Sequence, residues 1–432
     1  MTVTELYKIY LSHPNICTDT RKITEGCLFF ALKGENFDAN TFAAQALENG
    51  ASYAVIDDEH YKKGANFLLV ENTLAMLQDL AVHHRKQLKI PFIGLTGSNG
   101  KTTTKELINS VLSERFKTSA TKGNLNNHIG VPLSVLEIGE DIELAIIEMG
   151  ANHQKEIAML SSICLPNFGM ITNIGKAHLE GFGGIEGVKI GKGELYDFLQ
   201  ANSGTVFINE DSPALTEMAS KRKFEKIISY GTSNASHVKG ELIDNNPYLK
   251  IRWTANNETY EVPSQLTGTY NFENMLAAVA IGLEFGLTPA QINAGISKYA
   301  PKNNRSQILK TENNTLIGDY YNANPSSMVL AIENISKLQA DKKVVILGDM
   351  FEIGESVEEE HLNVLKKANS CNFDQVILVG KEFKKQSLNG KGLFFEETME
   401  AFEYLKKHPI SNALVLVKGS RSMKLEKLVE LL

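Results

Sequence analysis

Short apolar runs that end in glycine or polar residues recur along the whole chain and alternate with amphipathic stretches. The runs 144–147, 168–171 and 344–347 are apolar at nearly every position, as expected of strands buried on both faces of a parallel sheet. Helices are predicted where apolar positions recur every three to four residues, for example over 74–88 and 361–369. This alternation of strand and helix predicts an α/β fold.

Two breaks divide the pattern into three predicted domains, the number that a chain of 432 residues favours. A helical stretch ends at Lys89-Ile90-Pro91, and the chain turns polar around Pro301-Lys302-Asn303-Asn304. We therefore predict a small N-terminal α/β domain over 1–88, a central domain with a P-loop-type, mostly parallel sheet over 89–300, and a Rossmann-like domain over 301–432. The last domain lacks G-x-G-x-x-G, so it gives little support for a dinucleotide site.

The central domain opens on Gly94-Leu95-Thr96-Gly97-Ser98-Asn99-Gly100-Lys101-Thr102-Thr103-Thr104, between an apolar strand and a helical stretch. This order is typical of a phosphate cradle, in which backbone N–H groups and the start of a helix hold anionic oxygens. Lys101 would reach the outer phosphates and the Thr102 hydroxyl would hold a magnesium ion. The general pattern has glycine at position 95, where this chain has leucine; the alternative is a simple Gly/Thr turn.

Polar groups follow two other strands of the central domain. Glu148 directly ends a buried strand, and Thr172-Asn173-Ile174-Gly175 ends another. Because ligands of open α/β sheets bind at the carboxyl ends of strands, Glu148 is placed where a magnesium ligand is needed. His178 follows in a glycine-rich loop, where it can act as a ligand or in acid–base chemistry. The alternatives are a turn carboxylate for Glu148 and a structural role for His178.

Two further loops carry groups that can recognise a ligand. In Asp19-Thr20-Arg21 the arginine can grip a phosphate or a base edge, and a surface salt bridge is an equal alternative. The loop from Gly318 to Pro325 is polar and aromatic, which indicates a ligand edge, although Asn and Pro also favour simple turns.

Composition narrows the classes of partner. The net charge is −7, so no basic field attracts nucleic acid, and 43% hydrophobic with 22% charged residues is ordinary for a globular protein. No apolar run approaches the length of a membrane span, and the N-terminus has no secretory signal pattern. The four cysteines are scattered without C-x-x-C pairing, which predicts reduced thiols and a cytoplasmic protein.

Taken together, these stretches resemble the Mur ligase family, ATP-dependent amide-forming enzymes of peptidoglycan precursor synthesis. The likeness extends along essentially the whole chain, and 96–103 is the family's own version of the phosphate loop, which accounts for the missing glycine. Within the family, the likeness is to the branch that adds D-alanyl-D-alanine to UDP-N-acetylmuramoyl-tripeptide. It is carried by 123–132, by 319–325, by Gly348-Asp349-Met350 and by Val417-Lys418-Gly419-Ser420-Arg421.

The resemblance implies a role for each matching residue. Lys101, His178 and Lys192 are the expected catalytic residues. ATP is held by Thr96, Gly97, Ser98, Asn99, Gly100, Lys101, Thr102, Thr103, Asn271, Asn274, Arg305 and Asp319. Thr102 and Glu148 bind one of two magnesium ions and His178 the second, while Lys192 matches the lysine that carbon dioxide carbamylates. The substrates are held by Asp19, Thr20, Arg21, Lys33, Asn126, Asn127, Tyr321, Asn322 and Asn324. The resemblance implies two small-molecule substrates, UDP-N-acetylmuramoyl-tripeptide and D-alanyl-D-alanine. It implies no nucleic-acid partner and no membrane insertion, and we expect a monomer.

Two other functions remain open from the sequence. Another Mur or folylpolyglutamate-type ligase would share the phosphate loop and the lysine, but not 124–132 or 319–325. A regulatory P-loop switch would bind and hydrolyse nucleotide without ligating anything. The absence of an N-K-x-D stretch argues against a GTPase of that class.

Overall fold

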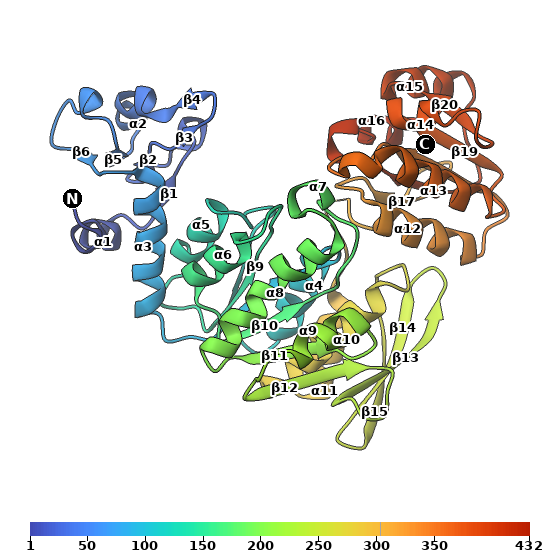
Figure 1. The fold of residues 1–432 in the computed structure, drawn as a ribbon, viewed down its shortest axis with the longest axis horizontal. Helices are drawn as coiled ribbons and strands as arrows, with labels where there is room; N and C mark the ends of the chain where they lie inside the picture. The colour runs from blue at the N-terminus through green and yellow to red at the C-terminus, as the bar shows by residue number, and fades with distance from the viewer. Residues whose placement is uncertain (303) are drawn as a thin grey trace.

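The computed structural model describes residues 1–302 and 304–432; Asn303, in the predicted second boundary, lies outside the described residues. These residues form sheets of four, nine and six strands and a two-stranded hairpin, which belong to three successive units of the chain. The first unit and the third lie on either side of the central unit (Figure 1). The predicted α/β fold with three units is confirmed.

No helix among the described residues combines the length and the apolar character that crossing a membrane requires.

The first unit is built on a parallel sheet with the strand order β1–β2–β5–β6. Its elements are α1 (Val3–Ser12), β1 (Ile16–Cys17), η1 (Thr20–Lys22), β2 (Leu28–Phe30), β3 (Lys33–Gly34), β4 (Phe37–Asp38), η2 (Ala39–Phe42), α2 (Ala43–Glu48), β5 (Tyr53–Ile56), η3 (Glu59–Tyr61), β6 (Phe67–Leu69) and α3 (Thr73–Gln87).

Helix α3 joins the first unit to the central one. It leaves the small sheet and runs alongside α5 and α6 (Figure 1). Its buried Leu77 and Leu80 belong to the same apolar core as Val131 of α5 and Leu160 of α6. The sequence correctly predicts this helix, but its packing against the next unit is set by distant contacts that local periodicity does not contain.

The central sheet has the order β15–β14–β13–β12–β11–β10–β7–β9–β8 and is parallel from β8 to β13. Its elements are β7 (Phe92–Thr96), α4 (Lys101–Leu112), β8 (Thr118–Ala120), α5 (Gly130–Leu136), β9 (Leu144–Glu148), α6 (Glu156–Cys164), β10 (Phe168–Ile171), α7 (Leu179–Phe182), α8 (Ile185–Ala201), β11 (Thr205–Asn209), α9 (Pro213–Ser220), β12 (Lys226–Gly231), β13 (Val238–Asn245), β14 (Leu249–Ala255), β15 (Glu258–Pro263), α10 (Asn271–Glu284) and α11 (Pro289–Lys298). Strands β13, β14 and β15 pair antiparallel with one another in that order.

The third unit has the strand order β16–β17–β21–β18–β19–β20, and only the β16–β17 pair is antiparallel. Its elements are β16 (Gln307–Lys310), β17 (Thr315–Asp319), α12 (Pro325–Lys337), β18 (Lys343–Gly348), η4 (Gly354–Ser356), α13 (Val357–Asn369), β19 (Gln375–Val379), α14 (Lys381–Lys385), β20 (Leu393–Phe395), α15 (Thr398–Lys407), β21 (Leu414–Lys418), η5 (Arg421–Met423) and α16 (Glu426–Val429).

Two elements extend beyond the apolar runs that indicate them. Helix α10 begins at Asn271, before its apolar run at 275–281, because its first turn carries the buried polar side chains of Asn271 and Asn274. Strand β17 extends to Asp319, which the sequence placed in the following loop. Both extensions bring a predicted site residue onto a regular element instead of a loop.

Candidate active site

A cavity of about 910 Å³ opens between the central and third units. The carboxyl ends of the neighbouring strands β9, β7 and β10 meet at its floor, so the phosphate loop, Glu148 and Thr172 lie at one sheet edge. This is the edge at which open α/β sheets bind their ligands. The cavity is lined by these predicted residues: Ser98, Asn99, Gly100, Lys101, Thr102, Thr103, Asn126, Asn127, Glu148, His178, Asn271, Asn274, Arg305, Asp319, Tyr321, Asn322 and Asn324.

The phosphate loop has the backbone that its glycines allow. Gly97 has φ +145° and Gly100 has φ +77°, values that side chains rarely permit. A Cβ on Gly97 would also overlap the hydroxyl oxygen of Thr172. Helix α4 then begins at Lys101, so its N-terminus points its free N–H groups at the loop.

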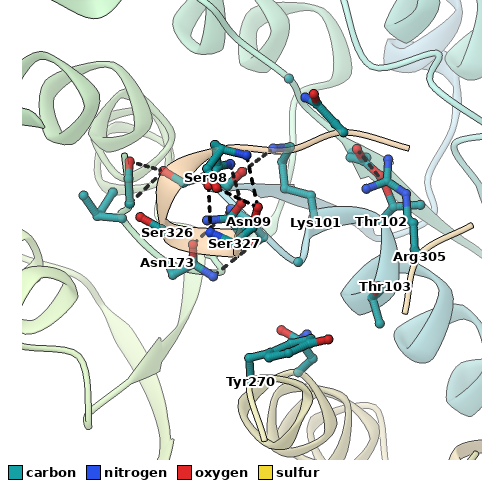
Figure 2. Close-up of a pocket in the computed structure, with 18 of the residues that line it drawn as sticks. Ser98, Asn99, Lys101, Thr102, Thr103, Asn173, Tyr270, Arg305, Ser326 and Ser327 are labelled. Carbon is teal, nitrogen blue, oxygen red and sulfur yellow. Dashed lines mark hydrogen bonds between the residues drawn. The ribbon is translucent and has the colours of Figure 1, made fainter. Parts of the chain in front are cut away.

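Hydrogen bonds fasten this loop to the segment after β10. The backbone N–H of Asn99 donates to Oδ1 of Asn173 at 3.0 Å, and the Thr172 hydroxyl donates to the Asn99 carbonyl at 2.6 Å. Ser98 Oγ donates to the Gly175 carbonyl at 3.1 Å. Figure 2 shows Ser98 and Asn99 within this network. The loop is therefore rigid and preorganised for an anion.

Lys101 lies at the centre of the cradle. Its Nζ donates to the carbonyl oxygens of Gly97 at 2.8 Å and of Ser98 at 3.2 Å. Burial lowers the pKa of Lys101; the nearby Glu148 carboxylate opposes that shift, and Arg305 adds to it. A cation in this position is matched to the outer phosphates of a nucleotide.

Glu148 and Thr102 offer oxygen ligands to a divalent cation. Thr102 Oγ1 donates to Glu148 Oε1 at 3.3 Å, and Asn126 Nδ2 donates to the same oxygen at 2.9 Å. Glu148 is 1% exposed, and its Oε2 has no hydrogen-bond partner among the described residues. Such an orphaned buried carboxylate oxygen next to a hydroxyl fits Mg²⁺, which takes few protein ligands and completes its shell with water and phosphate.

No group of three His, Cys, Asp or Glu side chains within the described part of the chain forms a metal cluster by itself.

His178 caps α7 with a left-handed backbone, φ +52°, and its Nδ1 lies 2.5 Å from Oε2 of Glu352 in the third unit. The approach of His178 lowers the pKa of Glu352. The imidazole is thus already engaged by a carboxylate from another unit.

Lys192 on α8 is buried beside the cavity, 1% exposed, and its Nζ donates to the carbonyl of the lining residue Ala151 at 3.1 Å. Burial is the largest cause that lowers its pKa well below the usual value, and the positive charge of Lys101 adds to it. Glu156 and Glu194 oppose the shift. The site therefore favours a neutral amine at Lys192.

The third unit contributes one wall of the cavity. Arg305 stacks over the Tyr321 ring at 4.0 Å, and Asp319 Oδ2 pairs with the buried Lys418 Nζ at 2.5 Å. Asn324 Nδ2 donates to Oδ1 of Asn99 at 2.7 Å, so a predicted substrate residue binds the phosphate loop in this structure. Asn322 Oδ1 accepts from the N–H of Ala323 in its own turn.

In the central unit, the predicted ATP-binding residues Asn271 and Asn274 form a buried pair. Asn274 Nδ2 donates to Oδ1 of Asn271 at 2.9 Å, and Thr104 of α4 donates to Oδ1 of Asn274. These contacts fix the start of α10 against the helix that follows the phosphate loop.

The remaining predicted residues lie outside this cavity. Thr96 is buried at the end of β7, and its hydroxyl donates to the Met149 carbonyl. Asp19, Thr20, Arg21 and Lys33 belong to the first unit. Arg21 pairs with Asp19 at 2.7 Å, the surface salt bridge that the sequence left open, and this pairing lowers the pKa of Asp19 to about 2. Lys33 pairs with Asp57 at 3.0 Å.

Sequence reasoning missed several residues of the site. Lys418 was noted only as part of a distinguishing stretch, and Glu352 was not singled out. Tyr270 lines the cavity, where its hydroxyl shares a hydrogen bond with Ser306 Oγ at 2.7 Å. Lys418 could have been found from the sequence, because it is a charged residue that directly ends an apolar strand. The same criterion identified Glu148.

Three family profiles match successive parts of the chain: "Mur ligase family, catalytic domain" at 14–88, "Mur ligase middle domain" at 95–282 and "Mur ligase, glutamate ligase domain" at 304–421. The UDP-N-acetylmuramoyl-tripeptide--D-alanyl-D-alanine ligase of Bacillus subtilis is 33% identical over 452 residues, which cover 99% of this chain and 96% of that protein. The chain belongs to the Mur ligase family.

Further Mur ligases resemble the chain at similar levels. The UDP-N-acetylmuramoyl-tripeptide--D-alanyl-D-alanine ligase of Escherichia coli is 35% identical over 423 residues, which cover 96% of this chain and 93% of that protein. The crystal structure of MurF from Acinetobacter baumannii superposes with a TM-score of 0.87 at 33% identity, covering 96% and 92% of the two chains. The predicted family and the assignment as a ligase are therefore confirmed.

Proposed function

We propose that this Mur ligase uses ATP to join D-alanyl-D-alanine to UDP-N-acetylmuramoyl-tripeptide, giving the UDP-linked pentapeptide of peptidoglycan synthesis, ADP and phosphate. Full-length relatives that carry the name of this reaction support the proposal. The observation that carries the chemistry is the convergence of Lys101, Thr102 and the orphaned Glu148 oxygen at one sheet edge. The free cysteines support a cytoplasmic protein, and we propose that it acts as a monomer.

The chemistry begins with two anions that repel each other. A carboxylate is a poor acyl donor until its oxygen is converted into a leaving group. We infer that the peptide carboxylate attacks the γ-phosphate of ATP in line, which gives an acyl phosphate and ADP. The free amine of the dipeptide then attacks the carbonyl carbon, and the tetrahedral intermediate expels phosphate.

The phosphate loop lowers the barrier of the first step. Lys101 and the N-terminus of α4 place positive charge against the outer phosphates, where negative charge moves during transfer. The hydrogen bonds between Asn99, Thr172 and Asn173 hold the loop N–H groups in place before the substrate arrives. Little reorganisation is then needed when the phosphoryl group leaves.

Thr102 and Glu148 would hold one Mg²⁺ ion, and His178 with a carbamylated Lys192 would hold a second. When bound, the metal neutralises phosphate charge and orients the reacting oxygens. The lowered pKa of Lys192 supports the carbamate, because only a neutral amine combines with carbon dioxide. The product would replace an ammonium by anionic oxygens suited to Mg²⁺.

The two other units would bind the ends of the reactants. In the first unit, Asp19, Thr20, Arg21 and Lys33 would hold the uridine end, reached by the exposed Arg21 guanidinium. In the third unit, Tyr321 and Asn322 would contact the dipeptide, while Arg305 and Asp319 close over ATP. Closure would exclude water and protect the acyl phosphate from hydrolysis.

Phosphate release with each reactant omitted in turn tests the proposed reaction. We expect sustained release only when ATP, Mg²⁺, the nucleotide-tripeptide and D-alanyl-D-alanine are all present, with the pentapeptide product identified by mass spectrometry. Sustained release with ATP alone would indicate a regulatory switch. Product formation from a folate and glutamate, supplied in place of the nucleotide-tripeptide and the dipeptide, would indicate a folylpolyglutamate-type ligase.

A further inference from the structure

One segment of the central unit that the third unit contacts at the catalytic edge is residues 175–180, in addition to the bond between Asn324 and Asn99. Lys176 N–H donates to Ser326 Oγ at 3.0 Å, and Lys176 Nζ pairs with Glu360 Oε1 at 2.5 Å. Two residues further on, His178 faces Glu352. The same segment is bound to the phosphate loop through Gly175 and Ser98. The segment 175–180 therefore links the third unit to the phosphate loop at the position of His178.

The contact between His178 and Glu352 has unusual local geometry on both sides. His178 has φ +52° and Glu352 has φ +62°, although neither residue is glycine. Left-handed backbone at ordinary residues is unfavourable and tends to persist where a functional arrangement requires it. Nδ1 of His178 is buried without a well-aligned hydrogen bond among the described residues, and Glu352 Oε2 approaches it to 2.5 Å.

We propose that Glu352 is a positioning residue for His178: its carboxylate keeps the proton of the neutral imidazole on Nδ1 and leaves Nε2 free for the nucleotide-bound metal. The inference rests on the proposed function, which gives His178 its metal. A ligating histidine is commonly fixed in tautomer and ring orientation by a carboxylate on its other nitrogen. Here that carboxylate comes from a different unit, so the imidazole is set only when the third unit is docked.

A stabilising role does not account for the contact equally well. The Glu352 side chain is 57% exposed, and an ion pair with one exposed partner contributes little to stability because water screens it. The neighbouring Lys176–Glu360 pair also joins the two units and also has one exposed partner, since Lys176 is 51% exposed, but it does not contact the imidazole. Either pair can be changed alone, so an effect of joining the units can be separated from an effect on His178.

The tautomer of His178 can be read directly by ¹⁵N NMR of protein labelled at its histidines, in the free enzyme and at mildly alkaline pH. The His178 signals are assigned by their loss in His178→Gln. We expect the wild type to show a protonated Nδ1 and an unprotonated Nε2. Glu352→Ala should shift these signals toward the Nε2-protonated form, which is the more stable tautomer of a free imidazole, whereas Glu355→Ala, at an exposed glutamate on the same segment, should leave them unchanged.

Kinetics of the complete reaction separate positioning from docking. Glu352→Ala should lower kcat by about 10- to 100-fold, the usual loss for a partner of a metal-ligating histidine, with a small change in KM for ATP. Glu352→Gln, which keeps an acceptor oxygen, should recover part of that loss. Glu360→Gln weakens docking but leaves the carboxylate at Nδ1, so it should raise KM for the dipeptide without moving the His178 signals.

Unchanged His178 signals in Glu352→Ala would overturn the proposal, as would an equal loss of kcat in Glu355→Ala. Failure of the proposed function has a different signature. In that case the wild type would form no pentapeptide, while the tautomer measurement on the free enzyme would still report whether Glu352 orients His178.

Discussion

The ammonium of Lys101 donates to the carbonyl oxygen of Gly97 at 2.8 Å, so the cation of the phosphate loop is held by the loop itself. A second carbonyl, that of Ser98, lies 3.2 Å away. Phosphate oxygens can take the place of these carbonyls without a change in the path of the loop. The lysine is therefore kept ready within the site before nucleotide binds.

Replacing Lys101 by Ala should lower the rate of ADP formation by at least about 100-fold, the loss typical of removing one preorganised donor to a developing charge. Lys101→Arg should not restore the rate, because the larger planar guanidinium does not fit a point-charge position. Coupled ADP assays at saturating ATP give the result, and circular dichroism checks the fold. A full rate in Lys101→Ala would remove the lysine from the mechanism.

Gly97→Ala should destabilise the protein by about 1–3 kcal/mol and abolish nucleotide binding, because the new Cβ needs a strained backbone and overlaps the Thr172 hydroxyl. Thermal unfolding with and without ATP measures both effects. Gly64→Ala is the matched control, since nothing lies within 4 Å of a Cβ at that position. Equal behaviour of the two variants would show that the loop does not have the backbone described.

Lys192→Ala should abolish ligation, and a short carboxylic acid added to the assay should restore part of the activity by supplying the missing oxygens. Lys189→Ala is the control, because Lys189 is three residues away and pairs with Glu186 at 2.8 Å. In wild-type protein equilibrated with ¹³C-labelled carbon dioxide, a carbamate signal should appear and be absent from Lys192→Ala. Retained activity in Lys192→Ala would contradict the carbamate assignment.

His84 should make stability fall on acidification. Its Nε2 lies 2.9 Å from the Ile138 carbonyl and its Nδ1 lies 3.2 Å from the Tyr7 hydroxyl, which together suit a neutral ring. Burial lowers the pKa of His84 below its ordinary value near 6.5. The unfolded chain therefore binds a proton first as pH falls, so the stabilisation present above about pH 6.5 is lost below it.

Melting temperatures of wild type and His84→Gln across this range test that dependence. The variant keeps polar contacts but cannot titrate, so it should lose less stability between neutral and mildly acidic pH. His83→Gln, at the neighbouring position, should retain the wild-type dependence. Parallel curves for wild type and His84→Gln would show that other groups control acid stability.

Local pattern was sufficient for strands buried on both faces and for bringing the phosphate loop and Glu148 to one sheet edge. Strands over 144–147 and 168–171 were predicted from continuous apolar runs and are present as β9 and β10. Glu148 lies at the carboxyl edge of the sheet because it directly ends the buried strand β9, and its role as a magnesium ligand stays a prediction. The hairpins β13–β15 were not predicted, although β14 alternates buried and half-buried positions as a one-sided strand should.

Contacts between residues far apart in the chain could not be predicted from local sequence patterns. Nothing local to Glu352 indicates that it faces His178, because the pairing depends on how the third unit is placed. The bond between Asn324 and Asn99 joins residues far apart in the chain for the same reason. The domain boundaries and the roles of the site residues stay predictions.

Helix α3 couples the folding of the first unit to that of the central unit, which carries the phosphate loop. Leu77 and Leu80 share one core with α5 and α6. Removing residues 1–88 would therefore expose an apolar surface on the fragment 89–432. Such a truncated enzyme should aggregate during expression, even though it retains the complete phosphate loop. Helix α3 thus joins the first unit to the unit that carries the phosphate loop through one continuous apolar core.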